Sequence, residues 1–273
     1  TCTTCQRTLL QATYQSGLFQ MSYRAESGHW YDKDGEPAYT TVGANGRERN
    51  TTLRDARKLN LVPSVTTVMG MAAKPALENW KIDQALLAAA TMQIRVGEPV
   101  EMFMARAKME SRQVGKRAAE RGTEIHGEIE RGFVENRCSA SFNAVKEVLD
   151  TLYPDTNWSA EKSFTCALGY GGKIDLCSDN GIFVDFKTKD NLDGKDPKKL
   201  VYDEHGMQLS AYAEGSGVTD PERVSIFIDR ANPEIVSYHV WDKESHKKHS
   251  EMFKALLTFW KLTKNYDPSE DIK

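Results

Sequence analysis

The segment GGKIDLCSDNGIFVDFKTKD, residues 171–190, restricts the possible folds of this chain more than any other stretch. Apolar residues dominate positions 182–186, which gives the second half the composition of a buried strand, and Asn180-Gly181 is a strong hairpin signal. The same strand carries Asp185 and Lys187. Burying an unpaired charge costs several kcal/mol or forces neutralisation, so these charges require a further partner. A bound cation is the obvious candidate.

The register of this hairpin decides whether Asp175 can share a face with Asp185. A two-residue Asn-Gly loop would send the two Asp side chains to opposite faces, because side chains alternate with a period of two. A three-residue loop over residues 179–181, closed by a type I turn with Gly181 at positive φ, pairs Asp175 with Asp185 instead. We predict the three-residue loop, which also places Lys187 on the shared face.

Two adjacent carboxylates beside a lysine are chemically suited to phosphodiester hydrolysis. Carboxylate oxygens suit a hard divalent ion, Mg²⁺ or Mn²⁺, which bridges to a phosphate. An ammonium group beside that ion can stabilise the charge that develops on a phosphoryl oxygen. An isolated Asp-x-Lys at a strand end is more often a solvated edge, so the rest of the chain has to decide between the two interpretations.

Composition favours one large globular domain, or a core with an added lobe. Of the 273 residues, 40% are hydrophobic and 27% are charged, and no apolar run is long enough to span a bilayer. The N-terminus lacks a secretory pattern, and the five cysteines are an odd number without a disulfide framework, so a reducing, cytoplasmic location is expected. Cys2 and Cys5 form a lone C-x₂-C pair, which favours free thiols over a zinc or iron–sulfur site.

A net charge of −3 means that any nucleic-acid surface has to be local. Residues 106–121 contain six basic and two acidic side chains, and several of the basic ones are spaced i,i+4 along a predicted helix. A solvated helix face explains this pattern equally well, but its position just before His126 favours phosphate contact. The predicted DNA contacts in this segment are Arg112, Lys116, Arg117 and Arg121.

The order of elements predicts an α/β or α+β fold. Irregular β structure is expected over residues 21–68, with a short strand in VPSVTTVM, followed by a helix from Pro75 with an apolar stripe. A second helix is expected from about Pro99 to Glu130, broken near Gly115 or Gly122. Further expected elements are a helix over 141–152, strands near 158–166, 172–177, 182–188, 223–230 and 234–241, and helices over 205–215 and 245–262. We predict an N-terminal β/helical lobe (1–98) and a core (99–273) built on a central mixed β-sheet flanked by helices.

Four short motifs follow one another over residues 121–212. R-G-T-x-x-H ends at His126, G-x-x-D ends at Asp175, D-x-K spans residues 185–187, and Q-x-x-x-Y spans residues 208–212. This order resembles the RecB-like branch of the PD-(D/E)XK nuclease superfamily, and PSVTTVMGMAAKPALENW looks like the N-terminal part of phage-encoded members. The resemblance implies a restriction-endonuclease-like core and a metal-dependent nuclease.

The resemblance also implies roles for the motif residues. Lys187 is the implied catalytic lysine, with Gln208 and Tyr212 supporting the site or the DNA, although helix packing explains the last two equally well. His126 taken alone fits a structural histidine. Within the motif it is implied as a metal ligand, and its imidazole suits Mn²⁺ better than Mg²⁺. The implied metal-site residues are His126, Asp175, Asp185 and Phe186.

Two further positions bear on the resemblance. Glu161 matches an acidic position found in some members, while a surface charge on an edge strand explains it equally well. Iron–sulfur members carry three cysteines near the C-terminus, whereas no cysteine follows Cys177 here, so no cluster is expected.

The loop over residues 191–206 joins the Asp185 strand to the Gln208 helix, and its lysines are expected to start close to the metal. A merely flexible loop is nearly as good an explanation. The predicted DNA contacts here are Lys189, at the end of the preceding strand, and the loop lysines Lys195, Lys198 and Lys199. The expected function is a metal-dependent DNA exonuclease acting on single strands or duplex ends in replication, recombination or repair. A structure-specific endonuclease and an inert DNA-binding module are the alternatives, and RNA stays open as a substrate because no reader of the 2′-OH is recognisable.

Overall fold

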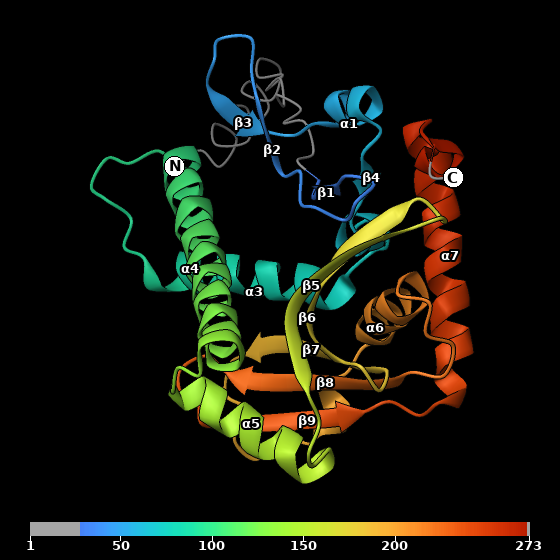
Figure 1. Cartoon of the computed structure of the whole chain (residues 1–273). Coiled ribbons are helices and arrows are strands. Elements are labelled where there is room, and N and C mark those ends of the chain that lie inside the picture. Colours follow the sequence, from blue (N-terminus) through green and yellow to red (C-terminus); the bar gives the residue numbers. More distant parts are fainter. Residues whose placement is uncertain (1–27, 272–273) are drawn as a thin grey trace, which may run out of the picture.

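The computed structural model describes residues 28–271 and has a five-stranded mixed sheet at its centre (Figure 1). The neighbouring strands β7 and β8 are parallel, and every other neighbouring pair is antiparallel. This arrangement confirms the predicted mixed α+β fold. The predicted free thiols Cys2 and Cys5 lie outside the described residues. The strands, in sheet order, are β5 (Trp158–Cys166), β6 (Tyr170–Ser178), β7 (Ile182–Lys189), β8 (Glu222–Asp229) and β9 (Val236–Val240).

Helices cover both faces of the sheet. α4 (Val100–Glu135) and α5 (Ala140–Leu152) pack on the face formed by alternate apolar residues of β7 and β8, among them Val184 and Ile226. α6 (Asp203–Gly215) and α7 (Glu244–Lys264) cover the opposite face, together with N-terminal elements. Because side chains alternate along a strand, Asp185 and Lys187 lie on the α6 side of β7. The chain also has two short 3₁₀ turns, η1 (Pro197–Lys199) and η2 (Pro268–Asp271).

The N-terminal elements comprise two small antiparallel ladders and two short helices. β1 (Trp30–Tyr31) pairs with β4 (Val62–Pro63), and β2 (Thr40–Val42) pairs with β3 (Glu48–Asn50). α1 (Leu53–Leu59) begins with a capping box in which Thr52 and Asp55 bond each other's backbone N–H groups. Ser64 of the following segment bridges Gly171 of β6, which ties these elements to the central sheet.

The prediction of a strand throughout VPSVTTVM is wrong in its second half. Only Val62–Pro63 is a strand, and α2 (Val65–Met69) follows at once. The Ser64 side chain caps this helix by accepting a 3.0 Å hydrogen bond from the Thr67 N–H. An N-cap contributes about 1 kcal/mol, which here outweighs the weak strand preference of the β-branched residues that follow it.

The prediction of a break in the long helix is also wrong, because α4 is continuous through both glycines. A glycine within a helix costs only about 1 kcal/mol relative to alanine, which packing offsets. A Cβ on Gly115 would lie 3.7 Å from the Trp80 ring, and one on Gly122 would lie 3.0 Å from the Thr188 Oγ1. The glycines therefore mark close contacts of α4 with α3 (Pro75–Thr91) and with β7.

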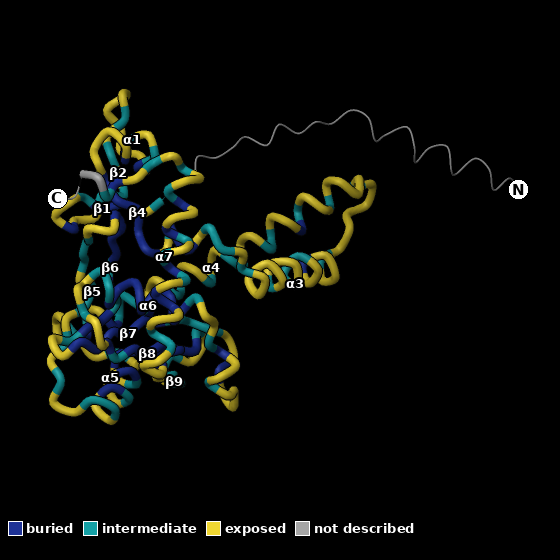
Figure 2. The backbone as a smooth tube through the Cα atoms, turned by 90° about the vertical axis from the view of Figure 1, so that its right-hand side faces the viewer, coloured by how far each residue is buried: buried dark blue, intermediate teal, exposed yellow. Residues whose placement is uncertain are grey.

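The helical hairpin of α3 and the N-terminal part of α4 projects from the body and is mostly exposed (Figure 2). The predicted helix from Pro75 is confirmed, but Leu77 is 43% exposed and Leu86 63% exposed, so the expected apolar stripe mostly faces solvent. Trp80 is its half-buried member, packed on Gly115. The division of the chain at residue 98 falls in the α3–α4 connection and stays a prediction.

Among the helices of residues 28–271, none combines the length and the apolar character that crossing a bilayer requires.

Candidate functional site

The β6–β7 hairpin adopts the predicted register. Leu176 pairs with Val184 and Cys177 pairs with Phe183, so the next position along the hairpin places Asp175 opposite Asp185. The Gly181 N–H donates to the Ser178 carbonyl at 3.2 Å, and Gly181 has a φ of 79°. The three-residue loop with glycine in the left-handed region is therefore confirmed.

Asp175 occupies the point where β6 and β7 separate. The ladder ends at Leu176 and Val184, and beyond it the Asp175 Oδ2 accepts a 2.9 Å hydrogen bond from the Phe186 N–H. His126 of α4 reaches the same carboxylate, with 3.7 Å between its Nδ1 and the Asp175 Oδ2. Its ring also meets the Phe186 ring edge-on at 5.9 Å between centroids. The predicted approach of His126 from a helix is confirmed, whereas its role as a ligand stays a prediction.

A chain of hydrogen bonds links the remaining predicted residues. Asp185 is fully buried, and its Oδ1 accepts a 2.7 Å hydrogen bond from the Lys187 Nζ. The same Nζ donates to the Gln208 Oε1 at 3.1 Å, and the Gln208 Nε2 donates to the Tyr212 hydroxyl at 2.8 Å. Gln208 therefore fixes the position of the ammonium group from one side while Asp185 fixes it from the other. Helix packing alone would not require this arrangement.

Two poorly exposed carboxylates lie close together in the site, beside the Lys187 ammonium group and the His126 ring. Burial raises the pKa of Asp175 to about 6, against the attraction of His126 and with the added repulsion of Asp185. Burial raises the pKa of Tyr212 well above its usual 10, and the nearby Asp175 and Asp185 carboxylates raise it further. The Tyr212 hydroxyl therefore keeps its proton at neutral pH. The raised pKa values of Asp175 and Tyr212 both follow from burial and from the nearby carboxylates.

These residues fit a divalent cation in donor chemistry. The Asp185 Oδ2 is buried and has no hydrogen-bond partner among the described residues, which is a costly state for a carboxylate oxygen. A hard cation shared with Asp175 would satisfy this oxygen and relieve the repulsion between the carboxylates. Over residues 28–271, however, no three His, Cys, Asp or Glu side chains are already grouped to hold a metal. The predicted ligand set with His126 and Phe186 stays a prediction.

Glu161 lies beside the site but contacts a different partner. The β5–β6 register places it opposite Asp175, at a position where its backbone has a left-handed φ of 54°. Its carboxylate forms an ion pair with Lys173. Glu161 is thus a neighbour of the candidate metal site without direct contact with it in this structure.

The predicted basic strip on α4 is largely paired with acidic neighbours. Arg117 contacts Glu110 at 3.3 Å, and Lys116 contacts Glu120 at 3.5 Å. Arg121 binds Glu124 at 2.7 Å, while Arg112 is exposed. Exposed pairs of this kind contribute little and exchange readily, so the DNA contacts stay predictions.

The loop after β7 is anchored, and it carries two of its lysines away from the site. Leu192 and Leu200 are buried against Phe227, and the Leu192 N–H donates to the Asp229 Oδ2 at 2.7 Å. η1 packs against β9, which lies two strands, or roughly 10 Å, from β7. The loop is thus anchored at Leu192 and Leu200, with η1 beside β9, and DNA contact by Lys198 and Lys199 stays a prediction. Lys195 stays nearer β7, where it donates to the Asp190 carbonyl at 2.9 Å.

Two residues near the site were not predicted from the sequence. His205 lies three residues before Gln208 on the same face of α6, so H-x-x-Q-x-x-x-Y extends the motif by one turn. Lys74 precedes α3 and contributes positive charge at His205. The i,i+3 spacing of His205 and Gln208 along the predicted helix could have identified His205 from the sequence. No sequence signal marks Lys74, because only the tertiary fold brings it to this region.

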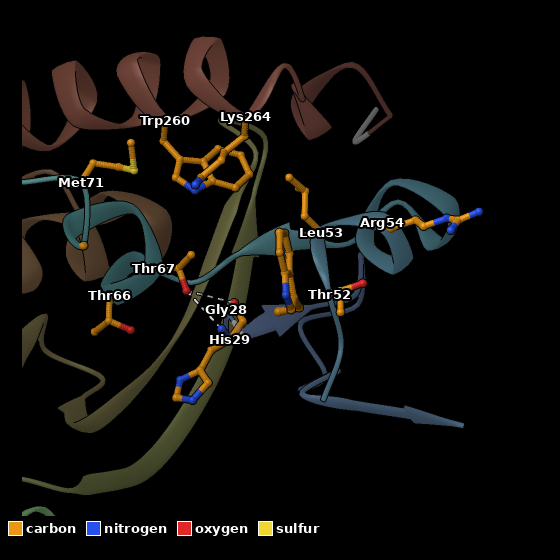
Figure 3. Close-up of a pocket in the computed structure, with 12 residues that line it drawn as sticks. Gly28, His29, Thr52, Leu53, Arg54, Thr66, Thr67, Met71, Trp260 and Lys264 are labelled. Carbon is orange, nitrogen blue, oxygen red and sulfur yellow. Dashed lines mark hydrogen bonds between the residues drawn. The ribbon is translucent and has the colours of Figure 1, made fainter. Parts of the chain in front are cut away.

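A separate cavity of about 650 Å³ lies between the N-terminal elements and α7 (Figure 3). Its walls include Leu53, Met71 and Trp260, and the His29 N–H at its edge donates to the Thr67 Oγ1 at 3.1 Å. None of the predicted site residues lines it. The cavity therefore belongs to a different part of the molecule from the candidate active site.

The close contact at Gly122 provides a test of whether the position of α4 affects metal binding and cleavage. Gly122→Ala should lower metal affinity and cleavage several-fold, because the new Cβ meets the Thr188 Oγ1 one helical turn before His126. Adding Thr188→Ala should restore both. Gly115→Ala is the matched control, since its Cβ makes only an ordinary contact, and it should be neutral or stabilising by up to about 1 kcal/mol. Equal behaviour of the two alanine variants in metal titration would contradict the assignment.

No protein-family model matches the chain, and no curated protein matches it in sequence. Among solved structures, the alkaline exonuclease LHK-Exo from Laribacter hongkongensis matches with a TM-score of 0.38 and 14% identity, covering 69% of this chain and 95% of its own. The crystal structure of SSO0001 matches with a TM-score of 0.30 and 15% identity, covering 66% of this chain and 85% of its own. At these TM-scores the likenesses define neither the fold nor the function of this chain.

Proposed function

We propose that this chain is a metal-dependent deoxyribonuclease with a restriction-endonuclease-like core, of the RecB-like branch of the PD-(D/E)XK superfamily. The observation that carries the proposal is the meeting of Asp175, Asp185 and Lys187 where β6 and β7 separate, with the ammonium held between Asp185 and Gln208. Paired carboxylates can hold a divalent ion, and an adjacent fixed lysine can stabilise charge on a phosphoryl oxygen, so the groups suit metal-assisted phosphodiester hydrolysis.

The protein residues have separable roles in this proposal. Asp175 and Asp185 would hold Mg²⁺ or Mn²⁺, with His126 and the Phe186 backbone as further donors. When bound, the ion would supply Lewis-acid stabilisation of a phosphoryl oxygen and a more acidic water. Lys187 places its positive charge where negative charge develops on the phosphate, and Gln208 keeps that charge in place. Tyr212 keeps its proton, so its hydroxyl can donate while accepting from Gln208.

We further propose exonucleolytic action on single strands or duplex ends, in DNA replication, recombination or repair, from the motif resemblance alone. End-labelled linear DNA and covalently closed circular DNA should be incubated with Mg²⁺, with Mn²⁺ and with chelator. Degradation of linear DNA only, dependent on the metal, is the expected result. Cutting of circles would identify an endonuclease, and binding without any cleavage would contradict the proposed enzyme and identify a DNA-binding module.

A further inference from the structure

Lysine side chains lie close to the N-terminal end of α6, whose first turn also contains Asp203 and Glu204. The first turn of this 13-residue helix has no side-chain cap, since Tyr202 at the N-cap makes no capping hydrogen bond. An uncapped helix N-terminus presents backbone N–H groups and a partial positive charge. Lys189 lies beside it, with its Nζ 5.2 Å from the centre of the Tyr202 ring.

His205, in the first turn of α6, has an unsatisfied ring nitrogen. The residue is only 7% exposed, and its Nδ1 is buried without a hydrogen-bond partner in the part of the chain that the structure describes. Its ring is held in place by Tyr202 at 5.6 Å and Phe227 at 5.7 Å between centroids. A buried polar group is rarely left unpaired, so this nitrogen indicates a partner that the protein chain does not supply.

The charges that act most strongly on His205 come from lysines. Burial lowers its pKa to about 3, with smaller contributions from the positive charges of Lys187, Lys189 and Lys74. The first turn of α6 also contains two acidic residues. Asp203 contacts Lys248 and His249, each at 3.2 Å. Glu204 raises the pKa of Lys189, but burial, Lys187 and Arg230 lower that pKa by more.

We propose that His205, Lys74 and Lys189, at the N-terminus of α6, form an anion pocket that binds a phosphate group of the nucleic-acid strand next to the scissile phosphate. The pocket adjoins the catalytic groups, because His205 precedes Gln208 by one turn and Lys189 follows Lys187 by two residues on β7. It would hold the strand through charge, with His205 and the helix N–H groups supplying directional hydrogen bonds. This inference rests on the proposed nuclease function for the identity of its ligand.

The test measures binding rather than cleavage. The dissociation constant of a labelled single-stranded oligonucleotide is determined in chelator over a series of salt concentrations. Lys74→Gln and Lys189→Gln should each weaken binding several-fold and reduce the slope of log K against log salt by about 0.7, as expected for one lost phosphate contact on a single strand. Lys146→Gln, an exposed lysine of α5 on the opposite face of the sheet, is the matched control and should leave the slope unchanged.

His205→Phe separates a hydrogen-bonding role from a packing role, since it keeps the aromatic contacts and removes both nitrogens. It should weaken binding several-fold without changing the salt slope, because no charge is lost. A second probe, inorganic phosphate, should compete with the oligonucleotide more weakly in these variants than in the wild type. Equal competition in the variants and in the wild type would count against the pocket.

Unchanged slopes for both Lys74→Gln and Lys189→Gln would overturn the anion pocket, even if the protein cleaves DNA. The Lys74 variant keeps this outcome accessible if His205→Phe fails to fold, since the Lys74 side chain makes no capping hydrogen bond. Absence of metal-dependent cleavage, with slopes reduced as expected, would instead contradict the proposed enzyme and leave the pocket as a DNA-binding site.

Discussion

Lys187→Ala should reduce DNA cleavage by about 100- to 1,000-fold while leaving DNA binding nearly intact, since losing one electrostatic contact to a developing charge raises the barrier by about 3 to 4 kcal/mol. The structure supports this expectation because the ammonium is already fixed between the Asp185 Oδ1 at 2.7 Å and the Gln208 Oε1 at 3.1 Å. Single-turnover cleavage of end-labelled DNA at saturating enzyme measures the chemical step, and binding in chelator measures affinity.

Asp185→Asn provides the comparison for this variant. It should also abolish cleavage, by weakening the metal site, yet DNA affinity should stay equal or rise because a negative charge facing phosphate is removed. Excess Mn²⁺ should partly rescue Asp185→Asn but not Lys187→Ala, since more metal cannot replace an ammonium group. Lys146→Ala, an exposed lysine of α5 on the opposite face of the sheet, is the control and should cleave normally. Cleavage close to wild type by folded Lys187→Ala would falsify the assignment.

The catalytic hairpin was predictable because its signals are local and agree with one another. Gly181 is a residue that favours positive φ, the loop length then fixes the register, and the register gathers the charges on one face. The spacing of Gln208 and Tyr212 predicted a shared helix face for the same reason. Each of these inferences depends on residues fewer than about a dozen positions apart.

The errors arose where packing between distant segments decided the outcome. α4 stays continuous because its glycines contact Trp80 and Thr188, neither of which is near in sequence. The apolar stripe of α3 correctly predicted a helix but not its burial, because amphipathic periodicity does not say whether another element covers the apolar face. A helix in place of a strand at Val65 followed from one capping serine.

The charged surface was the least predictable part of the site. Counting basic residues over 106–121 did not reveal that Arg117 and Arg121 contact acidic side chains from neighbouring helical turns. Chain connectivity suggested that Lys198 would stay near β7, whereas η1 packs against β9. Lys74, by contrast, comes from a segment more than one hundred positions before His205. Local charge in the sequence is therefore a weak guide to the electrostatic field at a site.

The metal-free protein should become more stable, and inactive, on Asp175→Asn. Burial raises the pKa of Asp175 to about 6, so the folded state binds this proton more tightly than the unfolded chain, in which an Asp titrates near 4. Stability from this group is present below about pH 4 and is lost as the pH rises to about 6, which amounts to about 3 kcal/mol at most. Asparagine is uncharged and can still accept from the Phe186 N–H, so it escapes that loss.

Urea unfolding in chelator should therefore show Asp175→Asn to be more stable than the wild type at about pH 8, with the difference vanishing near pH 4, where both side chains are neutral. Adding Mg²⁺ or Mn²⁺ at pH 8 should reverse the order, because an ion that binds only the folded wild type stabilises it by mass action. The matched control is Asp179→Asn in the exposed hairpin loop, which should respond to neither pH nor metal in this way. An Asp175→Asn protein that is less stable than the wild type at pH 8 without metal, or that is equally stabilised by metal, would show that this carboxylate is held by the protein itself and not reserved for a cation.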